Sequence, residues 1–172
     1  MVQYTKCSDL WSDYMDKKCS RLILNTFDGH MKDLKLKPKC LDSKVEFNIK
    51  YYNEADEIVD AVLIFYKVIA VDFEINYFDN YIGSELWGTY EITDRKYKID
   101  MIEKIFQNRL KHYLINGYDY DESEENDMLN ARHEYNKILK DIDDYHLYEQ
   151  ETMGGVFSII SKEYILKSNI KK

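Results

Sequence analysis

Hydrophobic and polar residues alternate over much of the first half of the chain, with the period of two that half-buried β-strands show. The clearest case is residues 45–51, in which Val, Phe, Ile and Tyr alternate with Glu, Asn and Lys. Residues 71–77 repeat this alternation, and residues 62–66 are apolar on both faces, as in a central strand. Leu86, Tyr90 and Ile92 predict one more strand, and Gly83 and Gly88 mark bends or bulges in it.

Two segments have the pattern of β-hairpins. Leucines at positions 22, 24, 34 and 36 flank Asp28-Gly29, and Asp-Gly between alternating runs is typical of a tight hairpin turn. Pro38, the single proline, is predicted to end this hairpin. The second hairpin is expected near the end of the chain, with arms at 145–151 and 156–166 around Met153-Gly154-Gly155.

The hydrophobic period changes after Asp94 to three or four residues, which is the period of an amphipathic helix. This pattern predicts a helix over residues 99–114 that stops at Asn116-Gly117. A second helix is predicted from about Ser123 to Asp141, with Leu129 among its apolar residues. A shorter amphipathic helix is predicted from Ser8 to about Cys19.

Strands dominate the first half, helices follow, and a hairpin returns at the end, without parallel β-α-β alternation. This order predicts an α+β fold in which two to three helices pack on one face of an antiparallel sheet that includes a C-terminal hairpin. The 172 residues contain no internal repeat and no linker. We therefore expect a single domain over residues 1–172.

Composition places the chain among folded proteins without disulfides. Hydrophobic residues make up 45% and charged residues 33% of the sequence, which speaks against disorder. The three cysteines, Cys7, Cys19 and Cys40, are odd in number and widely spaced, which predicts free thiols. Neither a signal-peptide stretch nor a membrane-spanning run of about 18 apolar residues is found, so we expect a cytoplasmic protein.

The net charge of −8 is unevenly distributed. Residues 1–52 carry 10 basic and 7 acidic side chains, whereas residues 53–172 carry 14 basic and 25 acidic ones. A strongly acidic surface repels the nucleic-acid backbone and attracts basic proteins. The sequence therefore predicts a basic protein partner, and binding to neither nucleic acid nor membrane.

Known catalytic and metal-binding motifs are not matched. The chain lacks a Gly-rich phosphate-binding loop, and Lys137 stands where a zinc-protease helix that began with His133-Glu134 would need its second histidine. The acidic run that begins at Asp119 resembles a calcium-binding loop, but Glu124 replaces the required glycine and Asn130 the closing glutamate. We therefore predict no catalytic residue, metal or cofactor, and expect a protein that is not an enzyme.

The same acidic run is the candidate partner-binding site, because tyrosines are interleaved with its carboxylates. Aromatic side chains anchor interfaces, and surrounding carboxylates accelerate encounter with a basic partner. The predicted site consists of Tyr118, Asp119, Tyr120, Asp121, Glu122, Glu124, Glu125 and Asp127. An equally good alternative is a solvated loop whose acidic residues complement the dipole of the following helix. The binding hypothesis requires the carboxylates to gather on one side of the molecule.

The alternating segments 45–51 and 71–77, the segment 85–91 and the acidic run after Asp119 together resemble the small acidic α+β immunity proteins that neutralise toxins in bacterial competition. This resemblance implies an inhibitor that occludes the active site of a cognate toxin, often a basic nuclease. Two alternatives stay open at this point. One is a phage or viral anti-defence protein that binds a host factor or mimics nucleic acid, and the other is an uncharacterised enzyme.

Overall fold

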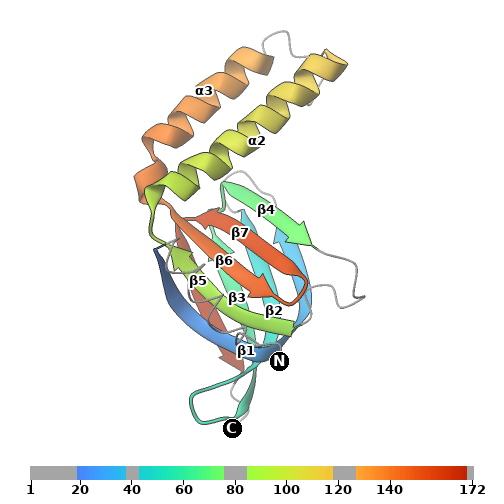
Figure 1. Ribbon diagram of the computed structural model, residues 1–172, viewed down its shortest axis with the longest axis vertical. Coiled ribbons are helices and arrows are strands. Elements are labelled where there is room, and N and C mark those ends of the chain that lie inside the picture. Colours follow the sequence, from blue (N-terminus) through green and yellow to red (C-terminus); the bar gives the residue numbers. More distant parts are fainter. Residues whose placement is uncertain (1–18, 38–42, 76–84, 118–126, 170–172) are drawn as a thin grey trace, which may run out of the picture. The chain divides into compact units, whose positions relative to one another are not determined.

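The computed structural model describes residues 19–37, 43–75, 85–117 and 127–169. These residues form an antiparallel sheet of eight strands, two α-helices and one short 3-10 helix (Figure 1). Contacts divide the chain into two compact units, a sheet unit of residues 1–94 and 146–172 and a helical unit of residues 95–145. The predicted α+β class with an antiparallel sheet is confirmed.

The sheet has the strand order β4-β7-β6-β5-β1-β2-β3-β8. Its strands are β1 (Ser20–Lys37), β2 (Lys44–Tyr52), β3 (Ile58–Tyr66), β4 (Ala70–Ile75), β5 (Glu85–Ile92), β6 (His146–Thr152), β7 (Gly155–Ser161) and β8 (Glu163–Asn169). The strands predicted at 45–51, 62–66 and 86–92 are confirmed, as is the described part of the strand predicted at 71–77. Alternation defines β2, in which Val45, Phe47, Ile49 and Tyr51 are buried.

The hairpin predicted around Asp28-Gly29 is wrong, because β1 runs through these residues as one strand of 18 residues. Its first part pairs with β5 and its last part with β2. Asp28 adopts a left-handed conformation (φ 57°), and the pairing with β5 shifts between Asn25 and Gly29. Asp28 and Gly29 therefore lie at a bulge in one continuous strand, whose first part pairs with β5 and whose last part pairs with β2.

The hydrophobic core lies between two halves of the sheet, which bends so that β2 and β3 face β6 and β7. The rings of Phe47 in β2 and Phe157 in β7 are 5.6 Å apart, and those of Phe65 in β3 and Tyr148 in β6 are 5.2 Å apart. Figure 1 shows β2 and β3 behind β6 and β7. Strands that are distant in the sheet order thus bury one another's apolar faces.

The predicted C-terminal hairpin is confirmed for β6 and β7, which pair around Met153 and Gly154. Its second arm is shorter than predicted, since the chain turns at Lys162 and continues as β8, which pairs with β3. The Lys162 N–H donates to the carbonyl of Tyr66 at 3.2 Å, and the Ile69 N–H donates to that of Ile160 at 2.9 Å. These bonds join the end of β7 to the chain that follows β3.

The helical unit consists of α2 (Arg95–Asn116), α3 (Asp127–Lys140) and the 3-10 helix η1 (Ile142–Asp144). The predicted end of the first helix is confirmed, because Gly117 is left-handed (φ 81°) and its N–H donates to the carbonyl of Tyr113. The packing differs from the prediction, since α2 and α3 pack against each other in a unit of their own. The helix predicted from Ser8 lies outside the described residues, apart from Cys19, which forms a turn.

Candidate protein-binding surface

The predicted acidic site falls almost entirely outside the described residues. Residues 118–126 are not described, and Asp127 is the first residue of α3. The roles of Tyr118, Asp119, Tyr120, Asp121, Glu122, Glu124, Glu125 and Asp127 therefore stay predictions. The structure does describe the helix ends between which this segment runs.

Three apolar side chains are strongly exposed at these helix ends. Leu114 and Ile115, in the last turn of α2, are 73% and 71% exposed, and Leu129, in the first turn of α3, is 68% exposed. These are the highest values for large hydrophobic residues in the described part of the chain. Helices α2 and α3 are the two arms of a helical hairpin (Figure 1). We call Leu114, Ile115 and Leu129 the hairpin tip, because they lie at the helix ends where the chain passes from α2 to α3.

Contacts between α2 and α3 hold the hairpin together behind this tip. The rings of Phe106 and Tyr135 stack with centroids 4.4 Å apart, and the Tyr135 hydroxyl donates a hydrogen bond to the Glu103 carboxylate. Arg109 and Glu134 form an ion pair at 3.0 Å. The hydrogen bonds from Tyr135 and Gln107 lower the pKa of Glu103. The hairpin tip therefore lies at the end of two helices that are held against each other by side-chain contacts.

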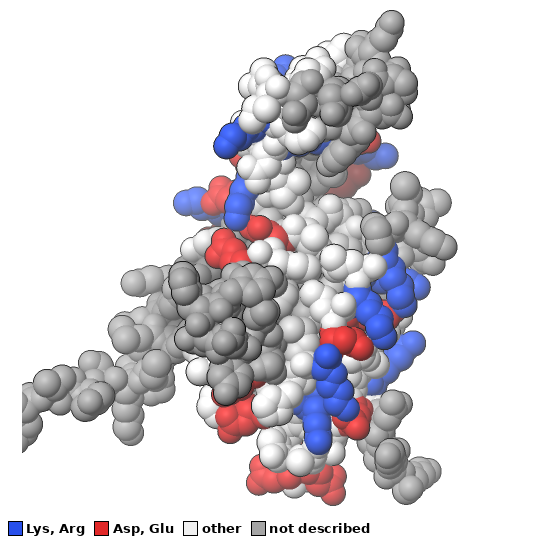
Figure 2. Space-filling model, turned by 90° about the vertical axis from the view of Figure 1, so that its right-hand side faces the viewer, with Lys and Arg blue, Asp and Glu red and all other residues white. Residues whose placement is uncertain are grey.

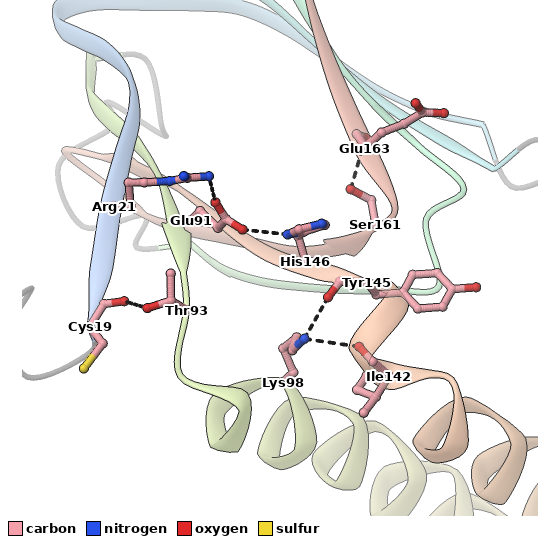
Figure 3. A network of polar contacts seen from close by, with 10 residues as sticks. All are labelled: Cys19, Arg21, Glu91, Thr93, Lys98, Ile142, Tyr145, His146, Ser161 and Glu163. Carbon is pink, nitrogen blue, oxygen red and sulfur yellow. Dashed lines mark hydrogen bonds and ion pairs between the residues drawn. The ribbon is translucent and has the colours of Figure 1, made fainter.

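The end of the helical unit at which α2 begins is also held by polar contacts (Figure 3). The Lys98 ammonium donates to the carbonyls of Tyr145 at 2.7 Å and Ile142 at 3.2 Å. Arg95 pairs with Asp143 at 2.7 Å, and this hydrogen bond lowers the pKa of Asp143. The start of α2 is therefore tied to η1, which follows α3.

Charges are mixed on the outer face of strands β1, β2, β3 and β8. Lys37 lies 2.7 Å from Glu46, and Lys32 lies 2.5 Å from Asp60. Figure 2 shows acidic and basic side chains next to one another over the sheet unit. This face therefore does not provide the one-sided acidic surface that the binding hypothesis requires.

The outer face of the other four strands carries a row of carboxylates. The strand register places Asp72 and Glu149 on either side of Ser158, and Glu74 and Glu151 on either side of Val156. Glu149 and Glu151 are only 6% and 2% exposed. Because side chains this deeply buried cannot contact a partner directly, we do not assign the binding surface to this row.

A third polar cluster joins the strands β1, β5 and β6 (Figure 3). The buried Glu91 carboxylate accepts a hydrogen bond from Arg21 with one oxygen, and its other oxygen lies 2.6 Å from His146 Nδ1. A carboxylate that orients an imidazole is also the basis of acid–base catalysis. The nearby Ser161 hydroxyl, however, donates to the carbonyl of Glu163 instead of to His146. We interpret the cluster as a tie between three strands.

No known protein family, curated protein or solved structure matches the chain. The described residues contain no group of three or more His, Cys, Asp or Glu side chains suited to a metal ion. Among the helices of the described part, none is long and apolar enough to cross a membrane.

Sequence reasoning missed the hairpin tip, although it placed these residues on helices. Leu114 and Leu129 were assigned to the apolar faces that helices bury, and the structure instead leaves both side chains exposed. Hydrophobic periodicity cannot show this difference. It indicates on which side of a helix a residue lies, but not whether the neighbouring helix extends far enough to cover that residue. One available signal was that Leu114-Ile115 precedes the helix stop directly.

Proposed function

We propose that this protein works by binding a basic protein partner through the hairpin tip. The observation that carries the proposal is the exposure of Leu114, Ile115 and Leu129 at the two helix ends that flank residues 118–126. Residues 118–127 include six carboxylates and neither lysine nor arginine. Exposed apolar anchors beside a block of like charge are what a charged interface requires.

The two features contribute to different steps of binding. Carboxylates outside the buried contact raise the rate of encounter with a basic surface, and this effect weakens as salt screens the charges. Apolar side chains that become buried in the complex slow its dissociation. Tyr118 and Tyr120 are the aromatic residues that we expect to join Leu114 and Leu129 as anchors.

The more specific form of the proposal is an immunity protein that occludes the active site of a cognate toxin. It is supported by the α+β class and by the resemblance of the sequence to small acidic immunity proteins. A basic nuclease is the toxin class that the acidic segment would suit best. An anti-defence protein that binds a host factor through the same tip is the alternative, and it differs in genetic context, because an immunity gene lies directly downstream of a toxin gene.

Capture from the native organism tests the proposal. Tagged wild-type protein should retain a basic protein, and the double variant Leu114→Ser/Leu129→Ser should retain at least tenfold less of it, since its anchors are lost. The matched control is Phe27→Ser/Ile58→Ser, which removes two sheet residues that are 60% and 55% exposed. Equal loss in both double variants, or no loss in the tip variant, would contradict a role for the tip.

A further inference from the structure

Strand β8 lies at one edge of the sheet. Within the described residues it pairs with β3 alone, from Glu163 opposite Tyr66 to Asn169 opposite Asp60. Tyr164 and Ile165 are 36% and 43% exposed, and Lys167 is exposed as well. An open edge of this length presents backbone N–H and C=O groups that can pair with another strand.

The charges of β8 are complementary to those of a second β8 that runs antiparallel to it. If a second β8 runs antiparallel with Ile165 opposite Ile165, Glu163 of each copy faces Lys167 of the other, and Tyr164 faces Leu166. Opposite charges at facing positions of antiparallel strands attract, whereas like charges there repel. Any other register loses both charge pairs.

The side chains of this arrangement also lie on matching faces. Glu163, Ile165 and Lys167 are in register with Tyr66, Ile64 and Val62 on β3, so all three point to the outer face of the sheet. Tyr164 and Leu166 are in register with Phe65 and Leu63, which are fully buried. Pairing between two copies would therefore extend the apolar inner face and the charged outer face together.

We propose that β8 pairs with β8 of a second copy of this chain, around a two-fold axis at Ile165. A second copy fits the edge, because reversal of the same sequence places Lys167 opposite Glu163 and Glu163 opposite Lys167. The intramolecular contact of Glu163 with Lys67 does not compete strongly, since it spans 4.0 Å between side chains that are 57% and 59% exposed. This inference is independent of the proposed function.

Sedimentation analysis over a range of protein concentrations tests the proposal. Wild-type protein should dimerise, and Lys167→Glu should raise the dissociation constant of the dimer about tenfold or more, because two pairs of carboxylates then face each other. Glu163→Lys should have the same effect. The double variant Glu163→Lys/Lys167→Glu exchanges the charges and should restore the dimer. Lys35→Glu, at a similarly exposed lysine of β1, is the matched control and should leave the dimer intact.

Hydrogen exchange shows which surface the copies use. Amides of β8 should exchange more slowly as the protein concentration rises, and those of the hairpin tip should not change. The proposal is overturned if the wild-type protein is monomeric throughout, if the double variant stays as weak as the single ones, or if protection rises elsewhere and not in β8. Circular dichroism of each variant excludes loss of the fold as the cause.

Discussion

At the residue scale, Asp28 and Gly29 show how two neighbouring residues permit one long strand with a bulge. Asp28 lies in the left-handed region, which aspartate tolerates better than most residues. A Cβ atom added to Gly29 would lie 2.7 Å from the carbonyl oxygens of both Lys50 and Thr26. The bulge thus depends on glycine at position 29 more strictly than on aspartate at position 28.

We expect Gly29→Ala to destabilise the protein by about 1–3 kcal/mol, since backbone atoms must move to admit the methyl group. Asp28→Gly should change the free energy of unfolding by less than about 1 kcal/mol, because relief of the left-handed conformation offsets the entropy cost of glycine. Denaturant unfolding of both variants measures the two effects. Equal losses would contradict this account of the bulge.

Because the Tyr148 side chain is only 4% exposed, we expect the folded protein to lose stability at alkaline pH. Burial raises the pKa of Tyr148, and the nearby Glu91 carboxylate raises it further. The folded protein therefore keeps this proton after the unfolded chain has lost it. The stability that Tyr148 contributes is full below about pH 10, the ordinary pKa of tyrosine, and is lost as the pH rises further.

Tyr148→Phe should therefore unfold less readily than the wild type above about pH 10, by up to about 1.4 kcal/mol per pH unit. Near neutral pH the variant should be almost as stable, since the ring contacts with Phe65 and Tyr164 are kept and the hydroxyl has no hydrogen-bond partner in the described part of the chain. Denaturant midpoints from about pH 8 to about pH 11, which lie on both sides of that pKa, provide the measurement. Parallel curves for the two proteins would show that the phenol does not carry the effect.

At the scale of elements, the sequence predicted strands better than their connections. Alternation in β2 matches its buried face residue by residue, because that strand has one face in the core. The same alternation at 22–36 did not show whether the halves of β1 pair with each other or with other strands. Residues 156–166 likewise read as one strand, although Lys162 divides them between two partners. Partner choice depends on contacts distant in sequence, which a local pattern does not contain.

We expect the pairing of α2 with α3 to become less stable in acid. The Tyr135 hydrogen bond holds the pKa of Glu103 below its ordinary value, so this contribution to stability is present above about pH 4.3, the pKa in an unfolded chain, and is lost as the pH falls. In Tyr135→Phe the stack on Phe106 is kept, and protection of α2 and α3 amides should depend less on pH in this range than in the wild type. Tyr113→Phe, on α2, is the control and should behave as the wild type.

At the scale of the whole molecule, the net charge of the sequence did not predict where on the surface the acidic side chains lie. The excess of acidic residues after position 53 includes Glu91, Glu149 and Glu151, which are buried in the sheet unit. The lysines of β1 are partly neutralised by Asp60 and Glu46. Composition counts every charge equally, whereas ion pairing offsets some charges and burial keeps others from direct contact with a partner. For this reason the binding proposal depends on the segment at the hairpin tip and on its exposed apolar neighbours.

The salt dependence of partner binding tests that proposal most directly. The measurement compares the wild type with a variant in which the six carboxylates Asp119, Asp121, Glu122, Glu124, Glu125 and Asp127 are changed to their amides. We predict that wild-type affinity for the captured partner falls steeply with added salt, and that the variant binds at least tenfold more weakly at low salt with a much shallower dependence. Equal affinities and equal salt slopes for the two proteins would contradict the proposed function.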